Sequence, residues 1–229
     1  FTERYNNYNK SLVTGGSMGN PYLQAEKSWS YELGADYRIG SNFKWGATVF
    51  LRDQNNLIDW TPTPYPMMPR QSNLVITGNY SLATNVSSVK TKGIETDLTY
   101  NKKWGEDYEL NLSTGLVWLS SNSPNKTPSF YISSHAKFLW NEQIVCRARQ
   151  LQLSINSVYK IRNTQTASAI NAALSDNYFL VNSKFAYLLK KRSSNVFVEI
   201  TNLTNTTYSD LLGAIMPSRW IAAGFQLHL

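Results

Sequence analysis

The strongest constraint in this sequence is a strict alternation of apolar and polar side chains that recurs along most of the chain. In its clearest example, from Trp29 to Ile39, every second residue is apolar or aromatic, and the residues between are polar, charged or glycine. Successive side chains of a β-strand point to opposite faces, so the pattern predicts a strand with one wet face and one apolar face.

The same alternation predicts about nine strands. The expected strands cover residues 27–39, 43–51, 94–101, 108–118, 131–140, 151–161, 179–189, 196–200 and 221–229. Most span roughly 10–13 residues, whereas soluble strands average about 5–6 and tilted membrane-crossing strands need about 9–11. Strand length therefore favours an all-β fold of membrane-crossing strands, as in a transmembrane β-barrel.

The segments between the expected strands alternate between short and long. Short turns are expected at 40–42, 102–107 and 190–194, an intermediate connection at 141–150, and long connections at 55–87, 121–130, 163–177 and 203–218. Outer-membrane barrels have this asymmetry, with short periplasmic turns and longer extracellular loops. If the last strand ends in the periplasm, counting back makes segment 1–26 extracellular.

Aromatic residues make up 13% of the chain and fall near the ends of many expected strands. Such rings prefer the lipid–water boundary, and membrane barrels carry an aromatic girdle at each interface. No stretch reaches the roughly 18 consecutive apolar residues of a membrane-spanning helix. From periodicity alone, the alternative is a soluble β-sandwich whose rings lie in the core or pair across strands.

Little in the sequence supports catalysis, a metal site, a cofactor or nucleic-acid binding. The net charge is +7, but its densest basic run, Lys190–Arg192, fits a solvated turn between strands. The single cysteine, Cys146, excludes an internal disulfide, and no Cys/His spacing indicates a metal centre. His135 and His228 lie on separate expected strands without a partner at motif spacing.

Charged residues on the polar side of the expected strands should line the barrel lumen. They are Glu32, Asp36, Arg38, Glu95 and Asp97. We interpret them as a polar wall in which carboxylates pair with Arg38, Lys44 or Arg52, rather than as general acids.

The long connection 55–87 contains the best candidates for ligand contact. Its prolines stiffen it, and it holds residue types that dominate binding surfaces, namely Trp60, Tyr65, Met67, Met68 and Arg70. A self-packed loop that covers the barrel mouth is an equal alternative.

Several segments resemble the family of TonB-dependent outer-membrane receptors. Residues 20–28, followed by Tyr31–Gly34, look like the family's "N-P-x-L-x-x-E" segment entering a strand, and Lys92–Glu95 is similar to its "x-G-I/V-E" strand. Residues 198–220 resemble the family's "N-L-F-N-x-x-Y … P-G-R" approach to the final strand. Thr204, Ser218 and Leu229 depart from the usual aromatic, glycine and terminal phenylalanine.

The resemblance implies an outer-membrane barrel of about 22 strands around an N-terminal plug. Residues 1–229 would be the C-terminal portion of that barrel, a partial antiparallel transmembrane β-barrel of about nine strands, with the plug upstream of this chain. The implied activity is binding and import of a scarce nutrient, an iron chelate, haem or cobalamin rather than a glycan, with no enzyme activity. The implied partners are the lipid of the bacterial outer membrane and the TonB energy-coupling protein, which would act through the missing plug. A surface lipoprotein is a further candidate partner.

Two rival interpretations remain open from the sequence. A small self-closing barrel, acting as a pore or an enzyme, needs an even number of strands, and the expected number is odd. A soluble carbohydrate-binding β-sandwich should stay in solution without detergent. Nine strands of a 22-stranded sheet would leave two unpaired edges, so we expect that this portion does not function alone.

Overall fold

The computed structural model describes residues 2–6, 16–72, 74–122, 136–162, 166–167, 172–189, 194–210 and 214–227. The described chain is all-β apart from helix α1 (Thr2–Tyr5) and the short 3-10 helix η1 (Tyr65–Met67). The strands are β1 (Ser17–Met18), β2 (Lys27–Ile39), β3 (Phe43–Pro64), β4 (Asn79–Trp104), β5 (Tyr108–Asn122), β6 (Ala136–Ala148), β7 (Leu151–Arg162), β8 (Thr166–Ala167), β9 (Ala172–Ala173), β10 (Asn177–Leu188), β11 (Asn195–Thr201) and β12 (Trp220–Gln226). In the described part of the chain, no helix is long and apolar enough to cross a membrane.

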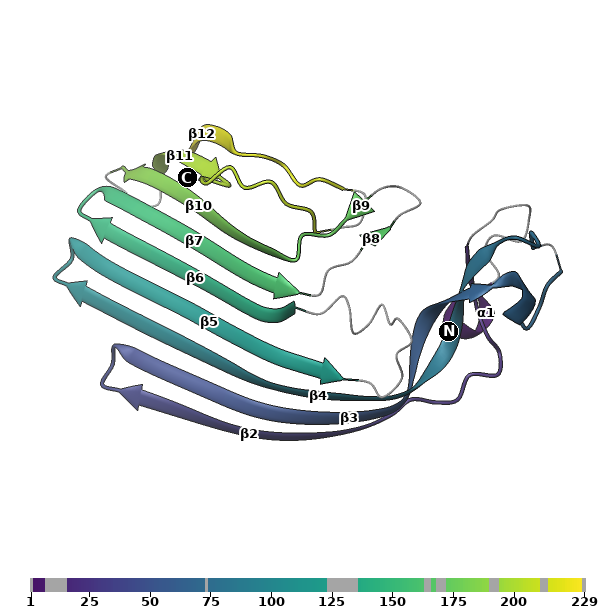
Figure 1. The fold of residues 1–229 in the computed structure, drawn as a ribbon. Helices are drawn as coiled ribbons and strands as arrows, with labels where there is room; N and C mark the ends of the chain where they lie inside the picture. The colour runs from purple at the N-terminus through teal and green to yellow at the C-terminus, as the bar shows by residue number, and fades with distance from the viewer. Residues whose placement is uncertain are drawn as a thin grey trace. The chain divides into compact units, whose positions relative to one another are not determined.

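Nine strands follow one another in a single sheet, in the order β12-β11-β10-β7-β6-β5-β4-β3-β2 (Figure 1). Strand β1 adds to this sheet in parallel beside β4. The pairings from β5 to β12 are antiparallel. The prediction of an all-β chain with about nine strands is therefore confirmed. Among the described residues, β2 and β12 each have a sheet neighbour on one side only.

The connections between these strands alternate in length, as the sequence predicts. The short ones are 40–42, 105–107, 149–150 and 189–194, and the long ones are 65–78, 123–135, 163–176 and 202–219. The basic run Lys190–Arg192 and the two histidines, His135 and His228, lie outside the described residues.

Of the strand expected at 131–140, residues 131–135 lie outside the described residues, and the predicted end at 140 is wrong, because β6 covers Ala136–Ala148. The sequence predicts a connection at residues 141–148, yet these residues pair with both neighbouring strands. Glu142 interrupts the apolar face of β6, while Leu139 and Val145 lie on its polar face. These three residues obscure the alternation of polar and apolar residues in the sequence, although β6 is a regular strand in the structure.

The expected loop 55–87 is also too long, because β3 continues to Pro64 and β4 begins at Asn79. Alternation still holds in this part of β3, since Leu57, Asp59 and Thr61 are all buried. Two of these three residues are polar, which hides the pattern in the sequence. The Thr61 hydroxyl is satisfied by the Leu82 carbonyl, 3.4 Å away, and by the Thr84 hydroxyl, 3.0 Å away.

Two compact units divide the chain. Unit 1 comprises residues 1–31, 50–92 and 120–135, and unit 2 comprises residues 32–49, 93–119 and 136–229. Unit 1 has its own apolar core, formed by Met18, Met68, Tyr80 and Leu82, with Tyr65 and Leu74 packed against it. Unit 2 is the strand array of β5, β6, β7, β10, β11 and β12 with the adjoining parts of β2, β3 and β4, and the turns 40–42, 105–107 and 149–150 lie at one end of it (Figure 1).

A tryptophan–threonine pair occurs twice on the apolar face of unit 2. Trp140 Nε1 donates to Thr114 Oγ1 (2.8 Å), which in turn donates to the Asn141 carbonyl (3.0 Å). Trp45 and Thr96 repeat the arrangement, since Trp45 Nε1 donates to Thr96 Oγ1 (2.8 Å) and Thr96 donates to the Gly46 carbonyl (2.9 Å). Each of these tryptophan and threonine donors therefore has an acceptor within the protein, which matters because an unpaired polar group in lipid is costly.

Candidate functional site

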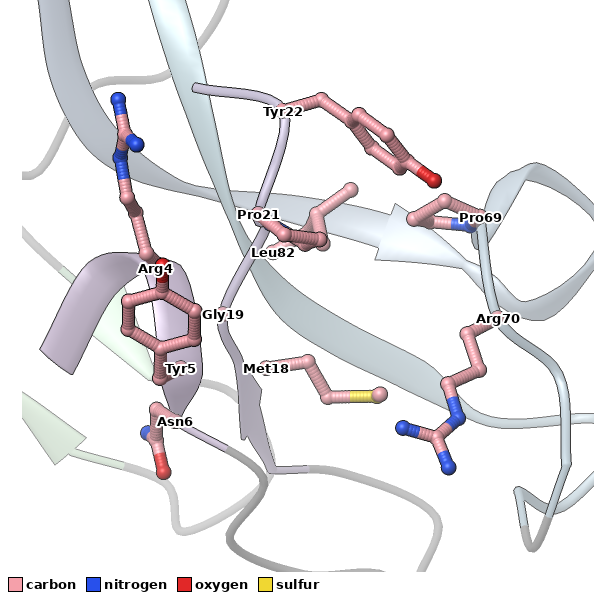
Figure 2. Close-up of a pocket in the computed structure, with 10 residues that line it drawn as sticks. All are labelled: Arg4, Tyr5, Asn6, Met18, Gly19, Pro21, Tyr22, Pro69, Arg70 and Leu82. Carbon is pink, nitrogen blue, oxygen red and sulfur yellow. The ribbon is translucent and has the colours of Figure 1, made fainter. Parts of the chain in front are cut away.

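A cavity of about 440 Å³ lies within unit 1 (Figure 2). It is lined by Arg4, Tyr5, Asn6, Met18, Gly19, Pro21, Tyr22, Pro69, Arg70 and Leu82. The lining combines two guanidinium groups and two phenol rings with an apolar floor. Concave, mostly apolar pockets that contain a few placed polar groups are the usual form of small-molecule sites.

Close backbone contacts hold α1 against the segment that follows it. Gly19 N donates to the Asn6 carbonyl (2.6 Å), and Asn20 N donates to the Glu3 carbonyl (2.8 Å). A Cβ at Gly19 would lie 2.7 Å from the backbone of Arg4 and of Asn6, so only glycine permits this approach. The N-terminal wall of the cavity therefore depends on backbone packing.

The connection 65–78 contributes the opposite wall of the cavity, and hydrogen bonds within the connection and to Tyr80 fix its shape. Tyr80 is 1% exposed, and its hydroxyl accepts a hydrogen bond from Val75 N (2.7 Å). Gly78 lies under this ring, because a Cβ there would be 2.6 Å from the Tyr80 hydroxyl. Met68 N donates to the Tyr65 carbonyl (3.0 Å), and Gln71 Nε2 donates to the same carbonyl (3.3 Å).

The five residues predicted for ligand contact fall in different environments. Trp60 lies in β3, Tyr65 packs against the core of unit 1, and Met68 is 4% exposed within that core. Met67 is 74% exposed, and Arg70 lines the cavity. The structure therefore brings only Arg70 of the five into the cavity wall, beside residues from the N-terminal segment that the sequence did not single out.

The two arginines of the cavity differ in how they are bonded. Arg4 donates through its NH2 group to the Leu23 carbonyl (2.7 Å). Arg70 donates through Nε to the Ser72 hydroxyl (3.3 Å), and within the described residues its two terminal nitrogens have no partner. Arg70 can therefore offer the two-pronged face of its guanidinium to an anion.

The predicted polar wall lies on the other face of unit 2 from the tryptophan–threonine pairs. Asp36, Glu95 and Asp97 line one shallow cavity of about 190 Å³ together with Gly34 and Gly46. Lys44 Nζ lies 3.9 Å from Asp36 Oδ1. Glu32 and Arg38 share this face by the two-residue period of β2.

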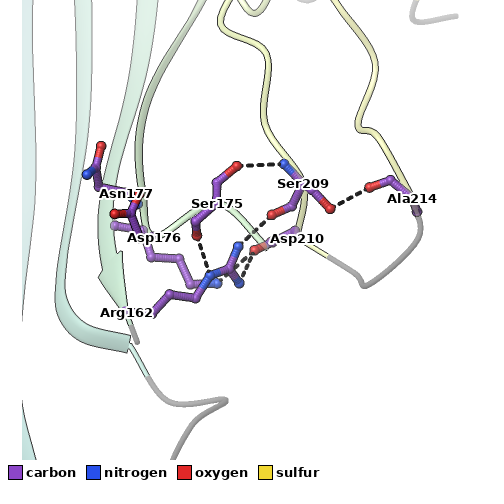
Figure 3. A network of polar contacts seen from close by, with 8 residues as sticks. Arg162, Ser175, Asp176, Asn177, Ser209, Asp210 and Ala214 are labelled. Atoms are coloured by element: carbon purple, nitrogen blue, oxygen red, sulfur yellow. Dashed lines mark hydrogen bonds and ion pairs between the residues drawn. The ribbon is translucent and has the colours of Figure 1, made fainter. Parts of the chain in front are cut away.

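A polar network in unit 2 attaches the connection before β12 to the ends of β7 and β10 (Figure 3). Arg162 has a side chain that is 3% exposed, and its guanidinium donates to Asp210 Oδ1 (2.8 Å), the Ser209 carbonyl (2.6 Å) and the Ser175 carbonyl (2.8 Å). Lys160 Nζ adds a second ion pair to Asp210 at 3.0 Å. We call this cluster the Arg162 latch.

Burial disfavours the charged form of Asp210, but the hydrogen bonds and charges of Lys160 and Arg162 outweigh it. The pKa of the Asp210 carboxyl is therefore lowered from its ordinary value. Nearby, burial raises the pKa of Tyr208, and the charge of Asp210 adds to that shift. The latch joins residues 48 positions apart, so no local sequence signal could have revealed it.

Within the described residues, no group of three His, Cys, Asp or Glu side chains could hold a metal ion.

Comparisons with known proteins fit this architecture. A family model described as "TonB dependent receptor-like, beta-barrel" matches residues 1–203. A search of the curated proteins found no match.

Several solved structures share the fold. The FrpB iron transporter from Neisseria meningitidis (F3-3 variant) is 15% identical with a TM-score of 0.57, and the alignment covers 92% of this chain and 31% of FrpB. The siderophore receptor PirA from Pseudomonas aeruginosa is 19% identical with a TM-score of 0.57, over 83% of this chain and 29% of PirA. The ferric enterobactin receptor PfeA from the same species, an R480A mutant in complex with enterobactin, is 18% identical with a TM-score of 0.56, over 91% and 32%.

This chain thus spans about a third of the length of those receptors. At such low identity the structural matches establish the fold, while the family model covers most of the chain. Members of that family are transport receptors of the bacterial outer membrane rather than enzymes. The chain accordingly belongs to the TonB-dependent receptor β-barrel family and is part of an outer-membrane barrel.

Proposed function

We propose that this chain is the C-terminal portion of the barrel of an outer-membrane receptor that binds an iron chelate and imports it. The barrel would contain about 22 strands around an N-terminal plug. TonB would supply energy through that plug, and a surface lipoprotein is a candidate accessory. Family membership and the fold shared with an iron transporter and two siderophore receptors support this proposal.

The observation that carries the iron-chelate assignment is the cavity beside Arg70. Ferric iron prefers oxygen ligands, and chelates built from carboxylate, phenolate or hydroxamate oxygens carry negative charge. Among the described residues, the terminal guanidinium nitrogens of Arg70 have no partner, while Tyr5 and Tyr22 provide rings for planar organic groups. Met67, 74% exposed, is a candidate for apolar contact.

The test is ligand binding to the full-length receptor in its native membrane. Arg70→Ala should weaken affinity for a recognised ferric chelate by about tenfold or more, the loss expected for a charge-assisted hydrogen bond. Arg70→Lys should recover part of it. Lys103→Ala, which removes an exposed lysine whose Nζ lies 3.8 Å from Glu109, should leave affinity unchanged.

Two failures of this test are distinguishable. Unchanged affinity in Arg70→Ala would remove the cavity from ligand binding without affecting the receptor assignment. A full-length receptor that binds haem, cobalamin or an oligosaccharide, and no ferric chelate, would overturn the iron-chelate proposal.

A further inference from the structure

Glu142 occupies an unexpected position on the apolar face of unit 2. The strand register places it directly between Thr114 of β5 and Ser157 of β7. The rows on either side of it are apolar, with Leu116, Trp140 and Tyr159 in one and Leu112, Ile144 and Ile155 in the other. Among the described residues, Glu142 is the sole charged side chain on this face of β5, β6, β7 and β10.

The other hydrogen-bonding groups around Glu142 do not pair with it. Thr114 already accepts from Trp140 and donates to the Asn141 carbonyl. Glu142 has no hydrogen bond or ion pair with any described residue, although it is half-buried. Its carboxylate therefore has no hydrogen-bond partner among the described residues, whereas the tryptophans and threonines of the two pairs on this face do.

The position of Glu142 along the strand places it within the lipid-facing band. It lies two residues from Trp140, about 7 Å along the strand, and six residues from the end of β6, about 20 Å, at a rise of roughly 3.3 Å per residue. The apolar band of a membrane barrel is about 25 Å tall. A charge in this band is costly, and intramembrane ionisable groups are by default functional.

A rigid aromatic ridge borders the carboxylate. The Trp140 ring stacks on Phe179 with centroids 6.1 Å apart and planes at 4°, and Tyr159 meets the edges of Phe138 and Phe179. The Trp140 indole is also fixed by its bond to Thr114. Anchored tryptophan and tyrosine rings beside the Glu142 carboxylate resemble the hot spots of protein interfaces, where these residue types are enriched.

We propose that the apolar face around Glu142 is a docking surface, inside the membrane, for a second protein that supplies a lysine or arginine to this carboxylate. Charge complementarity selects this occupant, because a basic side chain converts a costly lipid-facing charge into an ion pair. A second copy of this chain fits poorly. In a two-fold contact it would present Glu142 again, and the described strands β5 to β10 carry no basic residue on this face.

The test uses the full-length receptor extracted from its own outer membrane into lipid nanodiscs without prior detergent. Wild-type receptor should migrate as a complex with one defined partner. Glu142→Gln should reduce recovery of that complex at least tenfold, and Glu142→Lys should abolish it. The matched control is Glu199→Gln, on the opposite sheet face of β11, which should retain the complex.

A charge swap gives the decisive readout. Replacing the partner's basic residue with glutamate should restore assembly with the Glu142→Lys receptor, and ligand uptake by all variants confirms that the barrel folds. The proposal is overturned if the wild-type receptor migrates alone, if Glu142→Gln leaves the complex intact, or if no charge swap restores it. Carbodiimide coupling of Glu142 to phosphatidylethanolamine, rather than to a protein lysine, would assign the site to a lipid headgroup and also overturn it.

Discussion

At the residue scale, one hydroxyl group fixes the position of an aromatic ring on the lipid-facing side of the sheet by accepting its hydrogen bond. Thr114 accepts the Trp140 indole N–H at 2.8 Å and also donates to the backbone. In water either group would be solvated, but in lipid a lost partner leaves a polar group unpaired.

Thr114→Val keeps the shape of the side chain and removes both bonds. We expect the full-length barrel to lose about 1–3 kcal/mol of unfolding free energy, because the indole N–H is left without a partner. Urea unfolding in lipid vesicles measures this loss. Thr114→Ser retains the hydroxyl and should be nearly neutral, and an equal loss in both variants would contradict the role of the hydrogen bond.

At the element scale, the Arg162 latch attaches the connection 202–219 to the end of β7. One buried guanidinium bonds to two segments of the chain, through the Ser175 carbonyl and through Ser209 and Asp210. Asn202 strengthens the same connection, since its Nδ2 donates to the Thr206 carbonyl (2.9 Å) and its Oδ1 accepts from Thr206 N (2.9 Å).

Arg162→Met should free this connection while leaving the strands paired. The expected local cost is about 1–3 kcal/mol, the range for hydrogen bonds to a charged group, reduced by the partial exposure of Asp210. Faster amide hydrogen exchange in residues 202–210, with β7 unchanged, would show the effect. Exchange rates equal to wild type would contradict the latch.

The latch should also respond to pH, in a direction set by Asp210. Its pKa is lowered in the folded state, so its contribution is complete above the unfolded value of about 3.9 and is lost as pH falls through the folded pKa. Protection of residues 202–210 from exchange, relative to the intrinsic rate at each pH, should therefore fall only below about pH 4. Asp210→Asn should remove this acid dependence, and an onset near neutral pH would point to another group.

At the scale of the whole molecule, the two sheet edges determine whether residues 1–229 can form a closed barrel without further strands. Every residue of β2 is exposed, and in the described structure β2 and β12 pair on one side only. Unpaired strand edges in lipid leave backbone groups without partners.

We therefore predict that residues 1–229 in isolation neither form a closed barrel nor import ligand, and remain in solution only with detergent. Uptake by vesicles that contain the purified chain, and its sedimentation with and without detergent, measure these properties. Import by the isolated chain, or a detergent-free monomer, would contradict the proposal that this is one portion of a larger barrel.

Sequence alone determined the strands, because a two-faced strand in a membrane barrel must alternate and lipid permits few exceptions. Where lipid ceases to impose that rule, the sequence was a weaker guide, because β3 buries Asp59 and Thr61 in unit 1. Glu142 is an exception within the lipid-facing part of β6, and it obscured that strand in the sequence. Tertiary structure decided which distant residues meet, as in the cavity that joins Arg4 to Arg70 and the latch that joins Arg162 to Asp210. Such contacts depend on how connections fold back over the strand ends, and no local periodicity records that path.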